Sequence, residues 1–136
     1  MANMTRLLDL DPISLLARFQ PGANGPQIEN QLNEEGFTLG HFPQSWEYST
    51  LGGWIASRSS GQQSLKYGRI ENLFAGGEIV TPKGTLVIPT CPASSAGPDL
   101  RQFLLGSEGR MGIITEASVR ISPLPKSEYF GAVFFP

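Results

Sequence analysis

The segment from Gly106 to Gly112 holds three glycines, with Ser107 and Glu108 following the first of them. Glycine lets the main chain approach a ligand closely and adopt positive φ, so such a loop can turn several backbone N–H groups toward one acceptor. An ordinary tight turn needs one glycine or two. The spacing leaves two interpretations open, a loop shaped around a ligand and a turn that leads into a strand.

A second segment, from Thr38 to Gly61, combines paired glycines, two tryptophans and many hydroxyl groups. The hydroxyl residues are Ser45, Ser49, Thr50, Ser57, Ser59 and Ser60. Thr50 is suited to cap a helix that begins at Gly52-Gly53, and N–H groups at that helix start would favour an anion or a carbonyl-rich ring. The alternative is a serine- and glycine-rich loop around buried tryptophans. Two such loops in one small domain favour a shared ligand.

The composition is typical of one globular domain with low surface charge. The 136 residues are 40% hydrophobic and 16% charged, with a net charge of −2. A chain of this size buries enough surface to form a core without metals or disulfides. The basic residues are scattered, which argues against a nucleic-acid surface, and no apolar run approaches the ~20 residues of a membrane span.

The cysteine and histidine content narrows the chemistry further. Cys91 is the single cysteine, which excludes an internal disulfide and suits a reducing compartment. With His41 as the single histidine, a zinc site is not expected, and we predict no metal. The N-terminus lacks the pattern of a signal peptide. We therefore expect a soluble, cytoplasmic protein.

Apolar periodicity predicts strands joined by hairpins. Alternation from Ile13 to Phe19 predicts a half-buried strand that pairs with the leucines of residues 7–10. A second hairpin is predicted between Asn72 and Pro89, turning at Pro82-Lys83-Gly84. The clearest strand follows the glycine loop, with Ile113, Ala117, Val119 and Ile121 on one face. A last strand is predicted from Tyr129 to Phe135.

Two helices complete the expected elements. The first opens at Asn24-Gly25-Pro26, places Ile28 and Leu32 on its inner face and ends at Gly36. The second begins at Pro98-Asp99 and places Leu100, Phe103 and Leu104 on one side. Strands and helices connect through hairpins rather than strict βαβ units, which favours an α+β fold with a mainly antiparallel sheet flanked by helices.

The motifs of the chain resemble a known family. In order, they are T-x-G-H-x-P-x-S-x-E-Y-S-T-x-G-G-W from Thr38, K-Y-G-x-I-E from Lys66, V-T-P-x-G from Val80, G-P-D from Gly97 and G-S-E-G-x-x-G-x-I-T-E-A from Gly106. This succession resembles alkyldihydroxyacetonephosphate synthases and their bacterial relatives, which are FAD-binding proteins of the vanillyl-alcohol-oxidase (PCMH) type. The resemblance runs from about Arg6 to Pro136.

The resemblance implies FAD as cofactor and a set of residues that line it. The implied cofactor-binding residues are Gln44, Ser45, Trp46, Glu47, Tyr48, Ser49, Thr50, Gly53, Ser57, Arg58, Ser59, Ser60, Glu108, Gly109, Arg110, Met111, Gly112, Ile113 and Ile114. The histidine that matches His41 lies near the flavin and substrate in the synthases, so the resemblance implies a catalytic role for it. A lone loop histidine bonded to the backbone is the alternative.

The chain departs from the family pattern at two positions and in its extent. Gln44 stands where the eukaryotic synthases carry aspartate, and Tyr48 where they carry phenylalanine. The family's upstream glycine-rich pyrophosphate loop and its downstream cap domain have no counterpart in residues 1–136. The chain is therefore expected to be the second subdomain of a PCMH-type FAD-binding domain, as a single unit.

Two functions follow from this expectation. The first is an FAD-binding fragment of a flavin-dependent oxidoreductase or alkylglycerone-phosphate synthase-like enzyme. The second is a stand-alone, non-catalytic module that binds a ligand or oligomerises. A half-domain would expose apolar surface, so we also expect a homo-oligomer or a complementing flavoprotein chain.

Overall fold

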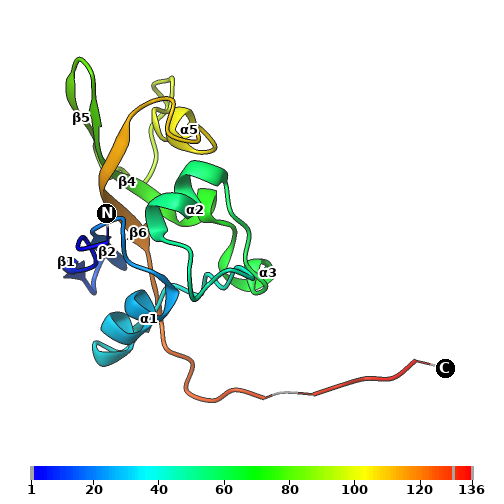
Figure 1. Ribbon diagram of the computed structural model, residues 1–136. Coiled ribbons are helices and arrows are strands. Elements are labelled where there is room, and N and C mark those ends of the chain that lie inside the picture. Colours follow the sequence, from blue (N-terminus) through cyan, green and yellow to red (C-terminus); the bar gives the residue numbers. More distant parts are fainter. Residues whose placement is uncertain (1, 130, 136) are drawn as a thin grey trace.

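Within residues 2–129 and 131–135, which the computed structural model describes, a five-stranded sheet has the order β1-β2-β6-β4-β5 and each neighbouring pair is antiparallel (Figure 1). In chain order the strands are β1 Leu7–Asp11, β2 Leu16–Phe19, β4 Phe74–Thr81, β5 Gly84–Ile88 and β6 Ile113–Arg120. Strand β6 lies at the centre and joins the two hairpins. The predicted hairpins and the predicted antiparallel sheet are confirmed.

Five short helices and a small second sheet complete the described fold. The helices are α1 Gly25–Glu34, α2 Leu51–Ser57, α3 Ser64–Tyr67, α4 Ile70–Leu73 and α5 Arg101–Leu104. Helix α2 packs against β6 and α5 against β4, so both lie on the same side of the sheet (Figure 1). Strands β3 Phe37–Thr38 and β7 Ser122–Pro123 pair with each other. This arrangement confirms the α+β class.

Helix α1 forms where its end signals predict it. The Asn24 side chain accepts from the backbone N–H of Gln27, and the Gln27 side chain accepts from that of Asn24, which makes a capping box. Ile28 and Leu32 are buried on the inner face of the helix. Past its end, Gly36 has φ +83°, a conformation that glycine adopts without strain.

One hydrophobic core lies between the sheet and its helices. Its fully buried side chains come from elements far apart in sequence: Phe19 of β2, Leu32 of α1, Ile55 of α2, Phe74 of β4 and Val119 of β6. Helix α2 contributes Leu51, Trp54 and Ile55 to this core, so packing of these side chains fixes its position.

The first predicted strand is shorter than expected. Residues 12–15 form the hairpin turn, so β2 begins at Leu16 rather than at Ile13. Asp11 Oδ1 accepts the backbone N–H groups of Ile13 and Ser14, and Ile13 is 93% exposed. The alternation of apolar and polar residues continues through the turn, and for this reason the predicted strand began too early in the sequence.

The predicted inner face of β6 is wrong at its first residue. Ile113 is 62% exposed, whereas Ile114 is buried. The pairing explains this: Ile79 of β4 is opposite Ile114, but Glu78 is opposite Glu116, so Thr115 is an extra residue in the ladder. A bulge of this kind shifts the alternation of faces by one residue.

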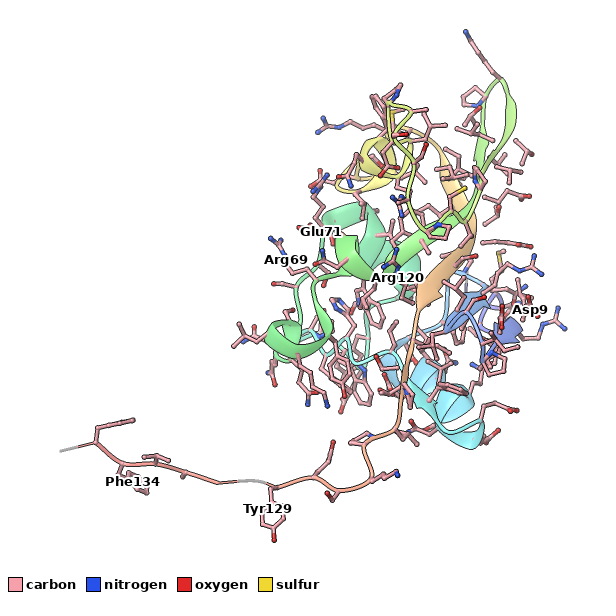
Figure 2. The ribbon with its side chains drawn as sticks, turned by 180° about the vertical axis from the view of Figure 1, so that it is seen from behind. Asp9, Arg69, Glu71, Arg120, Tyr129 and Phe134 are labelled. Carbon is pink, nitrogen blue, oxygen red and sulfur yellow. The ribbon has the colours of Figure 1, made fainter. Side chains whose placement is uncertain are left out.

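Two other predictions near the C-terminus are corrected. Helix α5 buries Leu104 but leaves Phe103 53% exposed and Leu100 39% exposed. The strand expected from Tyr129 to Phe135 is not formed: residue 129 and residues 131–135 are extended and exposed, and Phe130 lies outside the described residues. This segment runs away from the body of the fold (Figure 1), and Tyr129 and Phe134 project from it (Figure 2).

Candidate functional site

Helix α2 is the element around which the predicted site residues gather. Its N-cap is Thr50, whose side-chain oxygen accepts from the backbone N–H of Gly53 at 3.4 Å. One face of the helix is buried, while Gly53 and Ser57, one turn apart, are exposed on another. The Ser57 hydroxyl donates to the Gly53 carbonyl oxygen at 2.9 Å. The exposed face therefore presents main chain and small side chains to whatever lies against it.

At the N-terminal end of α2, hydroxyl groups form a hydrogen-bonded chain with Trp54. The Trp54 indole N–H donates to Ser49 Oγ at 2.6 Å, and Ser49 Oγ donates to the Ser45 carbonyl oxygen at 2.8 Å. Ser45 Oγ lies 2.9 Å from Ser49 Oγ and donates to it. This chain of hydrogen bonds fixes residues 45–49 on the helix.

His41 is buried beside Trp54 of α2 and is 1% exposed. Its Nε2 lies 3.1 Å from Ser59 Oγ, and its ring centroid lies 5.0 Å from that of Trp54. Among the described residues, Nδ1 has no hydrogen-bond partner. Burial lowers the pKa of His41 to about 4, so the imidazole is neutral near pH 7. The ring is thus placed to orient Ser59, and its catalytic role stays a prediction.

At the C-terminal end of α2, the glycine loop attaches to the last turn of the helix. The backbone N–H of Gly106 donates to the Ile55 carbonyl at 3.1 Å, and that of Glu108 donates to the Ala56 carbonyl at 3.0 Å. Arg58, the C-cap residue with φ 53°, donates from Nε to the Leu105 carbonyl at 3.1 Å. The structure therefore brings the two glycine-containing segments together at one helix.

Arg58 anchors this junction on its other sides as well. Its guanidinium donates to Gln102 Oε1 at 2.8 Å and lies 3.5 Å from a Glu71 carboxylate oxygen. Glu71 also lies 3.7 Å from the guanidinium of Arg69, and these two side chains lie together in Figure 2. Because its guanidinium is engaged by α4 and α5, Arg58 holds the loop to the helix.

Several N–H groups of the glycine loop are not free to form the cradle that its glycines predicted. Besides Glu108, the N–H of Arg110 donates to the Ser107 carbonyl at 3.0 Å and that of Gly112 to the Gly109 carbonyl at 3.4 Å. These N–H groups are satisfied within the protein, so that interpretation is wrong for them. Gly109, with φ +82°, instead borders open space: a Cβ there would have no atom within 4 Å.

The other predicted cofactor-binding residues fall into three groups. The exposed ones are Gln44, Ser45, Glu47, Tyr48, Gly53, Ser57, Ser60, Glu108, Gly109, Arg110, Met111 and Ile113. The half-buried ones are Trp46, Ser49, Thr50, Arg58, Ser59 and Gly112, and Ile114 is buried. The exposed group reaches the surface at both ends of α2 and along its open face.

One residue of this region was missed in the sequence. Glu29 of α1 is 7% exposed and receives hydrogen bonds from residues 38–40, directly before His41. Its signal was a charged residue on the same helical face as Ile28 and Leu32, where a carboxylate is seldom buried without partners.

Comparison with known proteins agrees with this architecture. Residues 1–88 match the FAD binding domain family. Alkyldihydroxyacetonephosphate synthase from Caenorhabditis elegans is 44% identical over all of this chain, which spans 23% of that protein. Glycolate oxidase subunit GlcD from Bacillus subtilis is 33% identical over 93% of this chain and 27% of its own length. A solved structure of alkyldihydroxyacetonephosphate synthase superposes with a TM-score of 0.89 at 44% identity, over 93% of this chain and 23% of that one.

The chain belongs to the FAD-binding domain family, with the fold of the second subdomain of PCMH-type synthases, and its cofactor is FAD. The surface at α2 fits this cofactor chemically. The exposed Ser60 hydroxyl can donate to ring carbonyls, the Ser57 oxygen can accept from hydroxyls of the ribityl chain, and Gly53 permits close approach. Within residues 2–129 and 131–135, no helix is long and apolar enough to cross a membrane.

Proposed function

We propose that this chain forms one wall of the FAD site of a flavin-dependent oxidoreductase or synthase. The supporting observation is that residues 45–49 attach to the N-terminal half of α2 and the glycine loop attaches to its C-terminal end, with the Gly53–Ser57 face exposed between them. Residues far apart in the sequence thus border a single surface. FAD contact with this surface would account for the hydroxyls and glycines that it carries.

Three groups of residues would hold FAD. Residues 44–50 would contact it from the N-terminal end of α2, Gly53 and Ser57 from the helix face, and Ser59 with residues 108–112 from the other end. When bound, FAD supplies a ring that accepts and returns electrons. The protein's own contribution is to bind and orient that ring. The guanidinium of Arg58 takes no part in this, because it is bonded within the protein.

The reaction we propose is that of a synthase-like member of the family. The chain shares 44–45% identity with three alkyldihydroxyacetonephosphate synthases and 33% with the glycolate oxidase subunit. His41 enters this proposal as a neutral, buried imidazole. The lone cysteine, Cys91, fits a cytoplasmic setting.

We also propose that further polypeptide completes the site, as a second copy or a complementing flavoprotein chain. The large apolar side chains of Ile113, Val133, Phe134 and Phe135 are between 62% and 91% exposed. Exposed apolar groups of this kind favour association. Light scattering of the purified chain should show an oligomer, and a monodisperse monomer that binds no hydrophobic dye would contradict this part of the proposal.

An FAD titration with two variants at Gly109 tests the function. Asparagine tolerates the φ of +82° that this position needs, whereas tryptophan would add bulk on the open side of the loop. Quenching of flavin fluorescence should be saturable for wild type and for Gly109→Asn, and lost for Gly109→Trp. Equal affinity in both variants, with unchanged melting temperatures, would show that FAD does not approach the loop.

A further inference from the structure

Glu29 is a buried carboxylate with all of its recorded partners in one short segment. Its Oε2 accepts from the Thr38 hydroxyl at 2.7 Å, and its Oε1 accepts from the backbone N–H groups of Leu39 and Gly40 at 3.1 and 3.2 Å. Burial raises the pKa of this carboxyl, and the three hydrogen bonds oppose that rise. A group that is costly to bury is thus retained where it fixes the residues directly before His41.

The same segment is clamped from its other side. Gly40 has φ +71°, and a Cβ on it would lie 2.4 Å from the ring of Tyr67. The main chain of residues 38–40 is therefore held in one position between the Glu29 carboxylate and the Tyr67 ring. This clamp sets the direction in which the next residue, His41, enters the core.

The surroundings of the His41 ring favour one tautomer. A protonated Nδ1 would be a buried N–H donor without an acceptor among the described residues, whereas an unprotonated Nδ1 leaves only an unused lone pair. Buried N–H groups without acceptors are rarer than under-used acceptors. The proton is therefore assigned to Nε2, which donates to Ser59 Oγ at 3.1 Å. The Ser59 hydroxyl then keeps its own proton for another acceptor.

We propose that Glu29 and His41 are positioning residues that present the Ser59 hydroxyl as a hydrogen-bond donor to the bound cofactor. Glu29 fixes residues 38–40, these fix the ring of His41, and the ring fills one acceptor site of Ser59. Ser59 follows Arg58 at the C-terminal end of α2, where the glycine loop also attaches. The inference rests on the proposed function, because the acceptor it assigns to Ser59 belongs to FAD.

The first test needs no cofactor. Nitrogen-15 NMR of the free chain distinguishes the two imidazole tautomers, and we expect the Nε2–H form in wild type. Glu29→Leu removes the acceptors of residues 38–40, so the His41 signals should shift or broaden. Glu29→Gln keeps one oxygen for the two backbone N–H groups and an amide that can donate to Thr38, so the wild-type signals should return. Glu34→Gln, at an exposed position of the same helix, is the matched control.

The second test is an FAD titration of the same variants together with Ser59→Ala. Glu29→Leu and Ser59→Ala should each weaken binding about tenfold, and the double variant should bind no more weakly than Ser59→Ala alone. Should Glu29→Leu fail to fold, Thr38→Val, which removes one hydroxyl, takes its place in the cycle.

Three outcomes would overturn the proposal. They are an Nδ1–H tautomer in wild type, additive losses of FAD affinity in the double variant, or His41 NMR signals that are unchanged in Glu29→Leu. A wild-type chain that binds no FAD would refute the proposed function and the cofactor contact of Ser59. The NMR results would still decide whether Glu29 positions His41, so the two failures are distinguishable.

Discussion

The two segments that meet at α2 are held in different ways. Residues 38–61 are fixed by side chains, through the Glu29 carboxylate, the His41–Ser59 contact and the bond from Trp54 to Ser49. The loop from Leu105 to Gly112 is fixed mainly by its backbone, through N–H bonds to the end of α2 and the grip of Arg58 on one carbonyl.

Because they are held differently, the two regions should respond differently to substitutions and to pH. The first segment is packed in the core, so its stability depends on side-chain shape and on the protonation of buried groups. The loop lies at the surface, with Glu108 and Met111 exposed, so its position depends on a few hydrogen bonds. The first segment should therefore act as a rigid wall of the site, and the loop as an adjustable one.

The largest expected effect is a pH dependence confined to the first segment. The pKa of His41 is lowered from 6.5 to about 4, so its neutral form adds stability that is present above pH 6.5 and is lost as the pH falls through about 4. This loss amounts to about 3 kcal/mol between pH 7 and pH 4. Urea unfolding of wild type and His41→Gln at both pH values measures it as a difference.

Glu29 contributes in the opposite direction, because its raised pKa adds stability at low pH that is lost as the pH rises through that pKa. Taking the difference between wild type and His41→Gln removes this contribution. A wild-type minus His41→Gln difference that stays constant between pH 7 and pH 4 would show that the imidazole is not buried as described.

A smaller effect is expected where Arg58 holds the loop. Arg58→Ala removes the guanidinium and keeps the unfavourable φ of 53°, so the unfolding free energy should fall by about 2 kcal/mol. Arg58→Gly also loses the guanidinium but relieves the backbone, and should be about 1 kcal/mol less damaging. Hydrogen exchange at the Gly106 and Glu108 amides should speed up in both variants. Arg110→Ala, at a side chain that is 83% exposed, is the control.

If the two regions are held separately, Trp54 fluorescence should stay unchanged in both Arg58 variants while the loop amides exchange faster. Equal disturbance of Trp54 and of the loop would mean that the two regions are one cooperative unit and are not held separately.

The smallest effect is a gain in stability on the helix face between the two regions. Gly53→Ala should raise the unfolding free energy by about 0.5–1 kcal/mol, because a Cβ there meets only Thr50 Oγ1 at 3.4 Å and alanine favours helices. Gly52→Ala should lower it, since its Cβ would lie 2.9 Å from Pro21 Cβ. If FAD lies on this face, Gly53→Ala should bind it more weakly despite being more stable, and thermal melts with FAD titration would check both.

Local signals made much of the fold predictable. Asn24 with Pro26 gave the start of α1, Thr50 gave the cap of α2, and Pro82-Lys83-Gly84 gave the turn of the second hairpin. The predictions were wrong where the local structure depends on a residue far away in the sequence. The bulge at Thr115 depends on pairing with β4, and no periodicity within β6 reveals it.

The site shows the same division. The sequence grouped residues 44–60 with residues 108–114, and the structure brings both groups to α2. It could not show that the loop N–H groups bond to carbonyls inside the protein, because Ile55 and Ala56 lie far away in sequence. The role of Glu29 was not predicted for the same reason, because its hydrogen-bond partners belong to another segment of the chain.

The most direct test is an NMR titration of the isotope-labelled chain with FAD. We expect the amide signals of Gly53, Ser57, Ser60 and Gly109 to shift together and to saturate at one affinity. Arg18 and Glu116, paired at 2.9 Å on strands β2 and β6 of the sheet, should not shift. Shifts at that pair without shifts along α2, or no saturable shift at any amide, would contradict the claim that this helix face binds FAD.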